Sequence, residues 1–384
     1  MLNEYQQSLF DDLVQLADKS EAFFITKTVN PVTGTAFWMF NYRLPSYTDF
    51  QLPSALESRG IMFEMNGNEP VSLSSMPMFK FFNLHENPDV MGLNLDMVER
   101  IETKADGSLI STYVDSGSVF LKTKGSLTSD QAVASYKWIQ EPSQADMWNS
   151  LQHLTLMGYT INMEWTSPRN RIVLAYQEDG LFILNIRNNQ TGVIYSSLKD
   201  LQSVCDFNVS HLEKYWIDSV DLSTVNKSDF VNQIDKMCGI EGYIVKFKDG
   251  KWVKVKTEQY RELHKTRDSV NNNKALYACI VNEAADELRS LFHDDPYSLK
   301  RIQVAEEHVS RHYNHMVKTV EDFYELNRNL SRKDYAIKGQ QDNPKHIFTL
   351  CMEKYIGRDV DYKAAMVKYY DIYPLPLANV EQLG

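Results

Sequence analysis

One short run of the chain, Lys104-Ala105-Asp106-Gly107-Ser108, joins a lysine to a tight turn. A lysine acts as a nucleophile only after its amine loses a proton, which requires a pKa lowered by burial or by neighbouring cations. Taken alone, the run is more typical of an exposed lysine beside a turn, because Asp-Gly is a common turn pair. The rest of the sequence has to decide between these interpretations.

Two expected hairpins bear on Lys104. The first runs from Ser108 through the turn Asp115-Ser116-Gly117-Ser118 to Lys124, and the second spans 241–258 around Asp249-Gly250. Asp-Gly between alternating residues indicates a two-residue hairpin loop. If the hairpins face each other, their lysines lie close to Lys104 and can also neutralise a triphosphate.

The second hairpin allows a register to be predicted. With a two-residue loop, Val245 pairs with Lys254 and Tyr243 pairs with Lys256. Cross-strand partners and alternate residues share a face of a sheet. This register therefore predicts that Glu241, Lys254 and Lys256 project from one face.

Two textures along the chain predict the elements that hold these residues. Leucines recur at helical spacing over 2–18, and short β-like runs between turn residues then extend to about Tyr260, including 37–40, 60–65 and 171–176. The expected helices lie at about 129–139, 145–157, 273–293, 297–327, 343–355 and 360–371. We therefore predict an α+β domain over 1–260, followed by an all-helical domain over 261–384.

Composition excludes several classes of protein. No apolar run approaches the roughly 20 residues of a membrane helix, and the acidic, amphipathic start lacks the pattern of a signal peptide. No C-x-x-C pair occurs among the four cysteines, which favours a reducing cytoplasm without zinc or disulfides. The net charge of −11 argues against a general nucleic-acid coat protein, although basic groups can still converge locally.

Six motifs occur in a fixed order along the chain. They are Ser58-Arg59-Gly60, Lys104-Ala105-Asp106-Gly107-Ser108, Lys122-Thr123-Lys124-Gly125-Ser126, Asn162-Met163-Glu164-Trp165, Glu241-Gly242-Tyr243 and Lys254-Val255-Lys256. With this series the chain resembles the RNA ligase 1 family of T-even bacteriophages, among the covalent nucleotidyltransferases. The resemblance implies an ATP-grasp-like nucleotidyltransferase domain of antiparallel sheets with helices.

The resemblance also implies a reaction. Lys104 would attack the α-phosphorus of ATP and hold AMP as a phosphoramidate. The AMP would pass to an RNA 5′-phosphate, and an RNA 3′-hydroxyl would then expel it. The implied partners are RNA with a 5′-phosphate and a 3′-hydroxyl, nicked tRNA among the candidates, and an end-healing kinase-phosphatase. The implied setting is a phage protein acting in the host cytoplasm.

Residue roles follow from the same resemblance. Tyr42 and Arg59 would lie around the nucleotide, and Lys80 and Lys124 would complete its pocket. Glu164 would contact the ribose or hold the adenylate. The residues implied near the reacting phosphate are Glu241, Lys254 and Lys256, the two lysines stabilising its transition state.

Magnesium is the expected metal, because a triphosphate reacts as its metal complex. The family position suggests Asp286 as a ligand, although a solvated helix face is the favoured interpretation of this residue. His308, His312 and His315 share a helix face and could bind a metal, but a face toward solvent or RNA is the preferred interpretation. The basic stretch 328–338, which includes one tyrosine, could touch a phosphate backbone or be a solvated face.

Two alternatives remain open. One is a related nucleotidyltransferase that acts on DNA nicks or caps RNA with GTP, which the absence of a β-rich tail after residue 260 disfavours. The other is a non-catalytic protein that binds RNA ends on a ligase scaffold, which the intact lysine and glutamate set disfavours.

Overall fold

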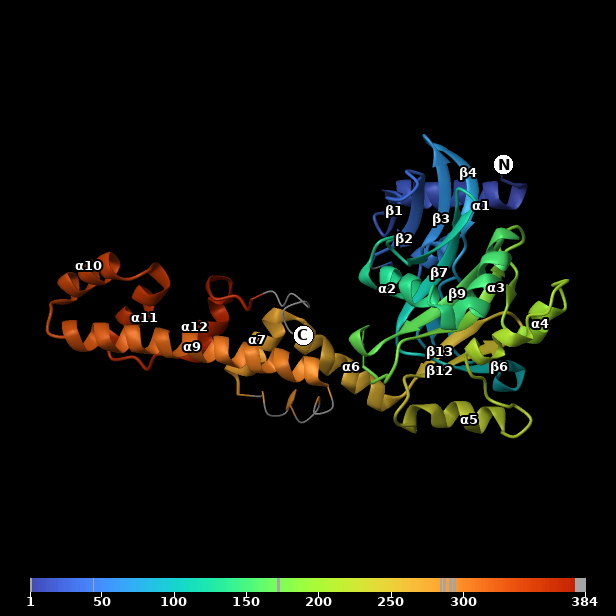
Figure 1. Ribbon diagram of the computed structural model, residues 1–384. Coiled ribbons are helices and arrows are strands. Elements are labelled where there is room, and N and C mark those ends of the chain that lie inside the picture. The colour runs from blue at the N-terminus through green and yellow to red at the C-terminus, as the bar shows by residue number, and fades with distance from the viewer. Residues whose placement is uncertain are drawn as a thin grey trace. The chain divides into compact units, whose positions relative to one another are not determined.

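The structure is a computed structural model that describes residues 2–43, 45–170, 173–283, 285, 288–289, 292 and 295–376. By its internal contacts the chain divides into two compact units, Met1–Arg261 and Glu262–Gly384. The first unit contains three β-sheets with helices, and the described part of the second is helical (Figure 1). This arrangement confirms the predicted α+β class with antiparallel sheets and a helical C-terminal region.

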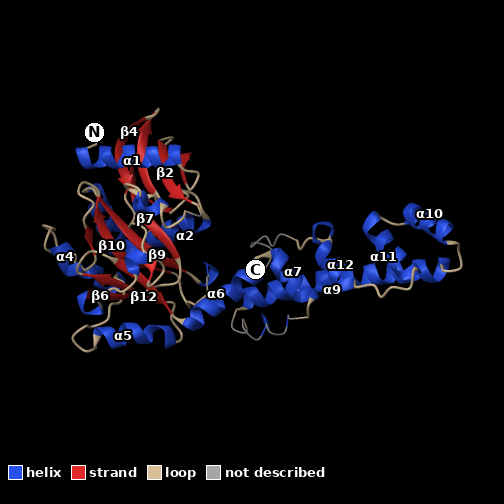
Figure 2. Ribbon diagram, turned by 180° about the vertical axis from the view of Figure 1, so that it is seen from behind, coloured by secondary structure: helices blue, strands red, loops and turns tan. Residues whose placement is uncertain are grey.

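The first sheet is antiparallel, with strand order β1-β2-β3-β4. Its strands are Phe23–Val29, Ala36–Tyr42, Ile61–Asn66 and Glu69–Ser75. Helix α1 (Glu4–Lys19) lies against this sheet and buries Leu9, Leu13 and Leu16 in the core (Figure 2). Asn3 and Gln6 form a reciprocal capping box, which confirms the predicted N-terminal helix and fixes its start.

The second sheet is antiparallel, with strand order β11-β10-β9-β7-β8. In that order its strands are Ile194–Tyr195, Gly180–Asn188, Tyr159–Thr166, Ser108–Asp115 and Ser118–Thr123. Helices α2 (Asp130–Ile139) and α3 (Ala145–Leu156), predicted within a residue or so at each end, pack into the same core as Ile110, Ile161 and Met163. Because side chains alternate along a strand, the neighbours of these core residues along β7 and β9 point to the other face of the sheet.

The third sheet has strand order β5-β13-β12-β6, with β5 and β13 parallel. Its strands are Phe82–Asn83, Trp252–Lys256, Gly242–Phe247 and Val98–Thr103. Ile101, Val245 and Val253 are fully buried in one core, together with Val231 of α5 (Lys227–Gln233). The opposite face of this sheet carries Lys254 and Lys256. Helix α4 (Leu198–Gln202) follows β11.

The two hairpins differ in how well they match the turns predicted from the sequence. In the first, Asp115 pairs with Ser118, and both residues between them have positive φ, as a two-residue primed turn requires. The predicted register of the second was wrong by one residue, since Ile244 faces Lys254 and Gly242 faces Lys256.

The loop of the second hairpin is one residue longer than predicted, because Phe247 and Lys251 close a loop of three residues, 248–250. The backbone N–H of Phe247 donates to the carbonyl of Lys251, and Gly250 adopts φ +83°. A left-handed glycine closing a three-residue loop is the usual alternative to the two-residue turn. Lys254 and Lys256 still share one face, because alternation within a strand does not depend on the register.

The expected strand at 171–176 does not form in its described part, 173–176. The backbone N–H groups of Val173 and Leu174 donate to Asp106 Oδ2 at 2.7 and 2.6 Å. The buried carboxylate of Asp106 therefore accepts hydrogen bonds from backbone N–H groups that would otherwise donate to the carbonyls of a neighbouring strand. Residues 171–172 lie outside the described part of the chain.

The second unit surrounds its own core, which includes Leu276, Val320 and Tyr335. Its helices are α6 (Glu258–Asn271, which begins in the first unit), α7 (Asn273–Val281), α9 (Pro296–Asn327), α10 (Arg332–Asp342), α11 (Lys345–Tyr355) and α12 (Tyr362–Lys368). The sequence predicted the long helix α9 closely and missed α6 and α10. Within the described residues, no helix is long and apolar enough to cross a membrane.

Candidate active site

A pocket of about 340 Å³ in the first unit gathers most of the predicted site residues. Those that line it are Tyr42, Arg59, Lys80, Lys104, Lys124, Glu164, Lys254 and Lys256. They come from the ends of strands β2, β6 and β8, from strands β9 and β13, and from the segments that lead into β3 and β5. Both hairpins thus contribute lysines to one pocket, as expected if they face each other.

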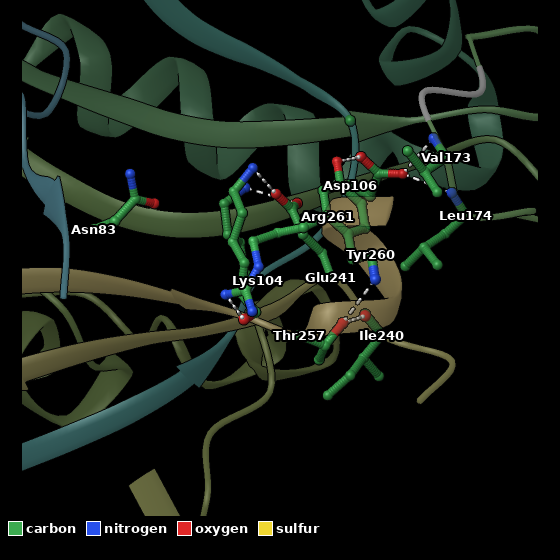
Figure 3. A network of polar contacts seen from close by, with 12 residues as sticks. Asn83, Lys104, Asp106, Val173, Leu174, Ile240, Glu241, Thr257, Tyr260 and Arg261 are labelled. Atoms are coloured by element: carbon green, nitrogen blue, oxygen red, sulfur yellow. Dashed lines mark hydrogen bonds and ion pairs between the residues drawn. The ribbon is translucent and has the colours of Figure 1, made fainter. Parts of the chain in front are cut away.

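Glu241 lies beside this pocket and joins two of its lysines. Its side chain is 2% exposed, and it accepts a hydrogen bond from Lys104 Nζ at 2.7 Å (Figure 3). It also pairs with Lys256 Nζ at 3.0 Å. The backbone N–H of Lys104 also donates to the carbonyl of Gly242 at 2.9 Å. The sheet that carries Lys256 therefore holds both ends of Lys104.

Asp106 connects the lysine motif to distant parts of the unit. Its carboxylate is buried and accepts from Val173, Leu174 and the Tyr260 hydroxyl, the last at 2.7 Å (Figure 3). The backbone N–H of Asp106 donates to the Tyr176 hydroxyl at 2.9 Å. Asp106 is thus a junction rather than part of an exposed turn, and it fixes the backbone on which Lys104 stands.

Glu164 meets the same motif from strand β9. Its Oε1 accepts from the backbone N–H of Gly107 at 3.2 Å. A Cβ on Gly107 would come within 2.2 Å of the carbonyl oxygen of Trp165, so only glycine allows this approach. Burial raises the pKa of Glu164 to about 7, the charge of Lys104 opposes this rise, and Glu241 adds to it. Near neutral pH, Glu164 can therefore donate or accept a hydrogen bond.

The cations of the pocket depress one another's protonation. Burial, followed by the charges of Lys80, Lys104 and Arg59, lowers the pKa of Lys254 to about 7. Burial also lowers the pKa values of Lys80 and Lys124, with Arg59 adding to both effects. A polyanion in this pocket would favour the charged form of each lysine.

Aromatic rings support three of these cations. Lys124 Nζ lies 4.9 Å from the ring centroid of Tyr42, and Lys80 Nζ lies 4.8 Å from that of Phe82. Lys256 Nζ lies 4.9 Å from the ring centroid of Tyr260. Such contacts hold an ammonium group in place while leaving it free to bind an anion.

A close crossing of three segments sets the position of Arg59. Gly60 has φ +89°, and a Cβ there would lie 2.5 Å from the carbonyl oxygen of Lys124. The buried Lys122 donates from Nζ to the carbonyl of Gly60 at 2.6 Å, and Asn41 donates to the carbonyl of Lys124 at 3.3 Å. These contacts bring Arg59, Lys124 and the end of β2 together.

The remaining sequence candidates have different outcomes. Asp286 lies outside the described residues. The rings of His308 and His312 lie with their centroids 4.4 Å apart and their planes tilted by 58°, and the ring of Tyr373 lies 4.9 Å from that of His312. Among the described residues, no group of three or more potential ligands could hold a metal. In the basic stretch 328–338, Tyr335 is fully buried and cannot stack on a base.

Sequence reasoning missed two contributors to the site. Asp106 stands in a motif that predicts no role for it, because its partners Val173, Leu174 and Tyr260 are far away in the chain. Tyr260 marks only the domain boundary in the sequence. Its hydroxyl bonds to Asp106, and burial raises its pKa far above the usual range. No spacing in the sequence signals either contact.

Comparison with known proteins decides the family. The model of the RNA ligase family matches residues 57–260, more than half of the chain. The chain belongs to the RNA ligase family. A second family model, the C-terminal domain of T4 RNA ligase 1, matches residues 267–375. One match thus falls in each unit of this RNA ligase family member.

Individual relatives are distant. A putative RNA ligase of Thermovibrio ammonificans is 24% identical over 65% of this chain and 64% of its own length. RNA ligase 1 of bacteriophage TS2126 is 27% identical over 64% of this chain and 60% of its own length. A putative bifunctional polynucleotide kinase/RNA ligase of Autographa californica nuclear polyhedrosis virus is 23% identical over 66% and 39%, respectively. The chain thus spans less than two thirds of each of these curated relatives.

Two solved structures are similar at a lower level. An archaeal ATP-dependent RNA ligase (form 2) has a TM-score of 0.46 and 12% identity, covering 94% of this chain and 95% of the other. A Naegleria gruberi RNA ligase mutant with ATP and Mn has a TM-score of 0.34 and 16% identity, covering 44% and 52%.

Proposed function

We propose that this member of the RNA ligase family is an ATP-dependent RNA ligase that adenylates itself on Lys104. The observation that carries the proposal is the position of Lys104 Nζ, 2.7 Å from a buried glutamate, at a pocket that is also lined by all five other cations to which the resemblance assigns a role. Those five cations are Arg59, Lys80, Lys124, Lys254 and Lys256. Such a pocket suits a nucleoside triphosphate and supplies the amine that attacks it.

The proposed reaction has three balanced steps. Lys104 Nζ forms a bond to the α-phosphorus of ATP, loses a proton, and the α–β phosphoanhydride bond breaks to release pyrophosphate. An oxygen of an RNA 5′-phosphate then displaces the lysine from that phosphorus. Finally, an RNA 3′-hydroxyl attacks the 5′-phosphate, loses its proton and releases AMP.

Individual residues have distinct proposed roles. Lys254 and Lys256 lie on the pocket face of β13 and neutralise charge at the α-phosphate during transfer. Glu241 orients the Lys104 amine before it attacks ATP, because it is the carboxylate that Lys104 contacts in the free protein. Glu164 holds the ribose or the adenylate, since it can both donate and accept near neutral pH. Tyr42 and Arg59 line the nucleotide pocket.

A magnesium ion fits this donor set as a companion of the nucleotide. Magnesium usually takes one or two carboxylates, phosphate oxygens and water rather than a protein cage. Glu241 and Glu164 are suitable carboxylates near Lys104, and the family position adds Asp286. The bound ion would supply charge neutralisation at the phosphates.

The proposed substrate is RNA with a 5′-phosphate and a 3′-hydroxyl. The proposed structured substrate is nicked tRNA, as the resemblance implies, and the second unit, in which residues 267–375 match the C-terminal domain of T4 RNA ligase 1, is the part that would recognise it. The fused kinase/ligase relative supports a partner that prepares the ends. We place the reaction in the host cytoplasm, where ATP and RNA are both available, consistent with the four free cysteines.

The test is a sealing reaction with two matched RNAs. A 5′-phosphorylated single strand with ATP and Mg²⁺ should give joined or circular RNA and a transient 5′-adenylated strand. The same strand with a 5′-hydroxyl should give neither product. Binding of the phosphorylated strand without adenylation would support the non-catalytic alternative. Sealing of nicked DNA in preference to RNA would support the DNA ligase alternative.

A further inference from the structure

Strand β10 carries an irregularity where it meets the pocket. Ile183 pairs with Met163, but the next pair joins Asn185 to Asn162, so Leu184 is an extra residue. In a regular strand, neighbouring residues point to opposite faces, whereas a bulge re-aims one of them. Leu184 and Asn185 consequently both line the nucleotide pocket.

A short relay of hydrogen bonds fixes the orientation of Asn185. Ser111 Oγ donates to Asn162 Oδ1 at 2.7 Å, and Asn162 Nδ2 donates to Asn185 Oδ1 at 2.9 Å. All three side chains are at most 2% exposed. With its oxygen engaged in this way, Asn185 turns its amide nitrogen the other way.

That nitrogen has a weak partner. Among the described residues, Asn185 Nδ2 donates to the thioether sulfur of Met78 at 3.5 Å, and Met78 also lines the pocket. A thioether accepts hydrogen bonds weakly and cannot donate, so it selects the NH₂ end of the amide. A buried amide with such a partner is costly unless a better acceptor arrives.

The surroundings of Asn185 indicate which part of a nucleotide supplies that acceptor. Leu184 and Met78 beside it are apolar and uncharged, whereas phosphates require the cations grouped with Lys104. Ligand sites commonly combine an apolar wall with a few fixed polar groups that read the ligand.

We propose that Asn185 is a specificity-determining residue that donates a hydrogen bond from Nδ2 to a ring nitrogen of the purine base of ATP. The inference rests on the proposed function, because it assumes that ATP occupies this pocket. The bulge at Leu184 and the relay from Ser111 are the devices that present the donor.

The test uses ATP analogues that lack one ring nitrogen each. Self-adenylation is measured in single turnovers with ATP, 1-deaza-ATP, 3-deaza-ATP and 7-deaza-ATP, for the wild-type chain and Asn185→Leu. In the wild type, one analogue should show a half-saturating concentration about three- to tenfold higher than ATP, the size of one neutral hydrogen bond. Asn185→Leu should show that increase with ATP itself and no further increase with the same analogue.

Two further variants separate contact with the base from general damage. Asn189→Leu removes another buried asparagine, outside the pocket lining, and should leave the analogue preference intact. Asn185→Asp keeps an oxygen for Asn162 and removes the donor, so it should lose the preference even if Asn185→Leu does not fold.

The outcomes distinguish the inference from the proposed function. A wild-type chain that forms no adenylate with ATP overturns the proposed function. A wild-type chain that is labelled, but shows the same analogue effects as both Asn185 variants, overturns the assignment of Asn185 alone.

Discussion

Lys254 carries an ammonium group that burial and three nearby cations disfavour. The α-phosphate of a nucleotide would reverse this effect, because an opposite charge stabilises the protonated form. Binding of ATP would therefore be coupled to the uptake of a proton by Lys254. Lys254 is consequently the residue at which charge and catalysis can be separated most clearly.

We expect Lys254→Ala to slow self-adenylation at saturating ATP by about 10²–10³-fold, the loss typical of one positioned charge in a partly desolvated site. Lys251→Ala is the matched control. Lys251 points away from the pocket face, is exposed and pairs with Asp249 at 3.4 Å. Single-turnover labelling measures both variants. Equal losses in the two would rule out a special role for the pocket face of β13.

The affinity for ATP should also depend on pH. The pKa of Lys254 is about 7 in the free protein, so above pH 7 the amine must take up a proton when phosphate binds. Affinity should fall by up to about tenfold per pH unit above pH 7. Calorimetry with a non-hydrolysable analogue, in buffers of different ionisation enthalpy, measures the proton uptake.

Lys254→Gln provides the comparison for this pH dependence. It should bind more weakly at pH 6.5 and show a flatter profile above pH 7. Because Glu164 titrates in the same range, only the difference between the two profiles reports on Lys254. Identical slopes for variant and wild type would mean that Lys254 is not the group that takes up the proton.

Sequence patterns at this scale identified residue types well and contacts poorly. Lys104, Glu164 and the two lysines of β13 stand in recognisable motifs, and the structure brings them to one pocket. The motif with Asp106 gave no sign that its carboxylate binds the backbone of 173–174. Long-range partners of a single side chain leave no periodic trace in a sequence.

At the scale of elements, the pocket depends on close backbone crossings. Gly60 lets the segment before β3 pass the end of β8, and Gly107 lets the lysine motif pass β9. Each crossing places a functional side chain close by, Arg59 in the first case. A side chain at either glycine would move the elements apart.

Gly60→Ala should therefore damage both stability and catalysis. Gly34 is the matched control, since it also has positive φ but a Cβ added there would meet nothing within 4 Å. Gly34→Ala should cost about 1–2 kcal/mol, the strain of a left-handed alanine. Gly60→Ala should cost about 1–3 kcal/mol more from overpacking.

Urea unfolding and the labelling rate measure the two effects of these glycine variants. Only Gly60→Ala should slow adenylation under conditions in which both variants remain folded. A similar cost and an unchanged rate for both would show that the crossing at Gly60 does not position Arg59.

The errors of prediction at this scale have local causes. The predicted register of the second hairpin was wrong by one residue because Asp-Gly occurs in both two- and three-residue loops, which the sequence does not distinguish. The missed helix α10 lies in a stretch whose most obvious feature in the sequence is its charge. Its Tyr335 is buried and bonds to the carbonyl of Cys351 at 3.2 Å.

At the scale of the whole molecule, the two units match two separate family models. The sequence predicts a domain boundary near Tyr260, because β-like runs give way there to helical spacing. Tyr260 itself has to stay with the first unit, since its hydroxyl binds Asp106. We predict that the second unit confers a preference among RNA substrates.

A truncated chain, 1–266, should keep self-adenylation within about threefold of the full-length rate, because every described residue of the pocket precedes residue 261. It should seal a nicked stem-loop less well than a simple single strand. Comparing the two RNAs with both chains measures the change in preference. A truncated chain that folds but forms no adenylate would indicate that the second unit completes the nucleotide site.

The central claim is that Lys104 becomes covalently bound to AMP. The most direct measurement is mass spectrometry of peptides from the protein after incubation with ATP and Mg²⁺, for the wild type and Lys104→Ala. We predict an added AMP on the peptide that contains Lys104, and no adenylate anywhere in a folded Lys104→Ala protein. An adenylate on another lysine of the wild type, or undiminished labelling of Lys104→Ala, would contradict the account.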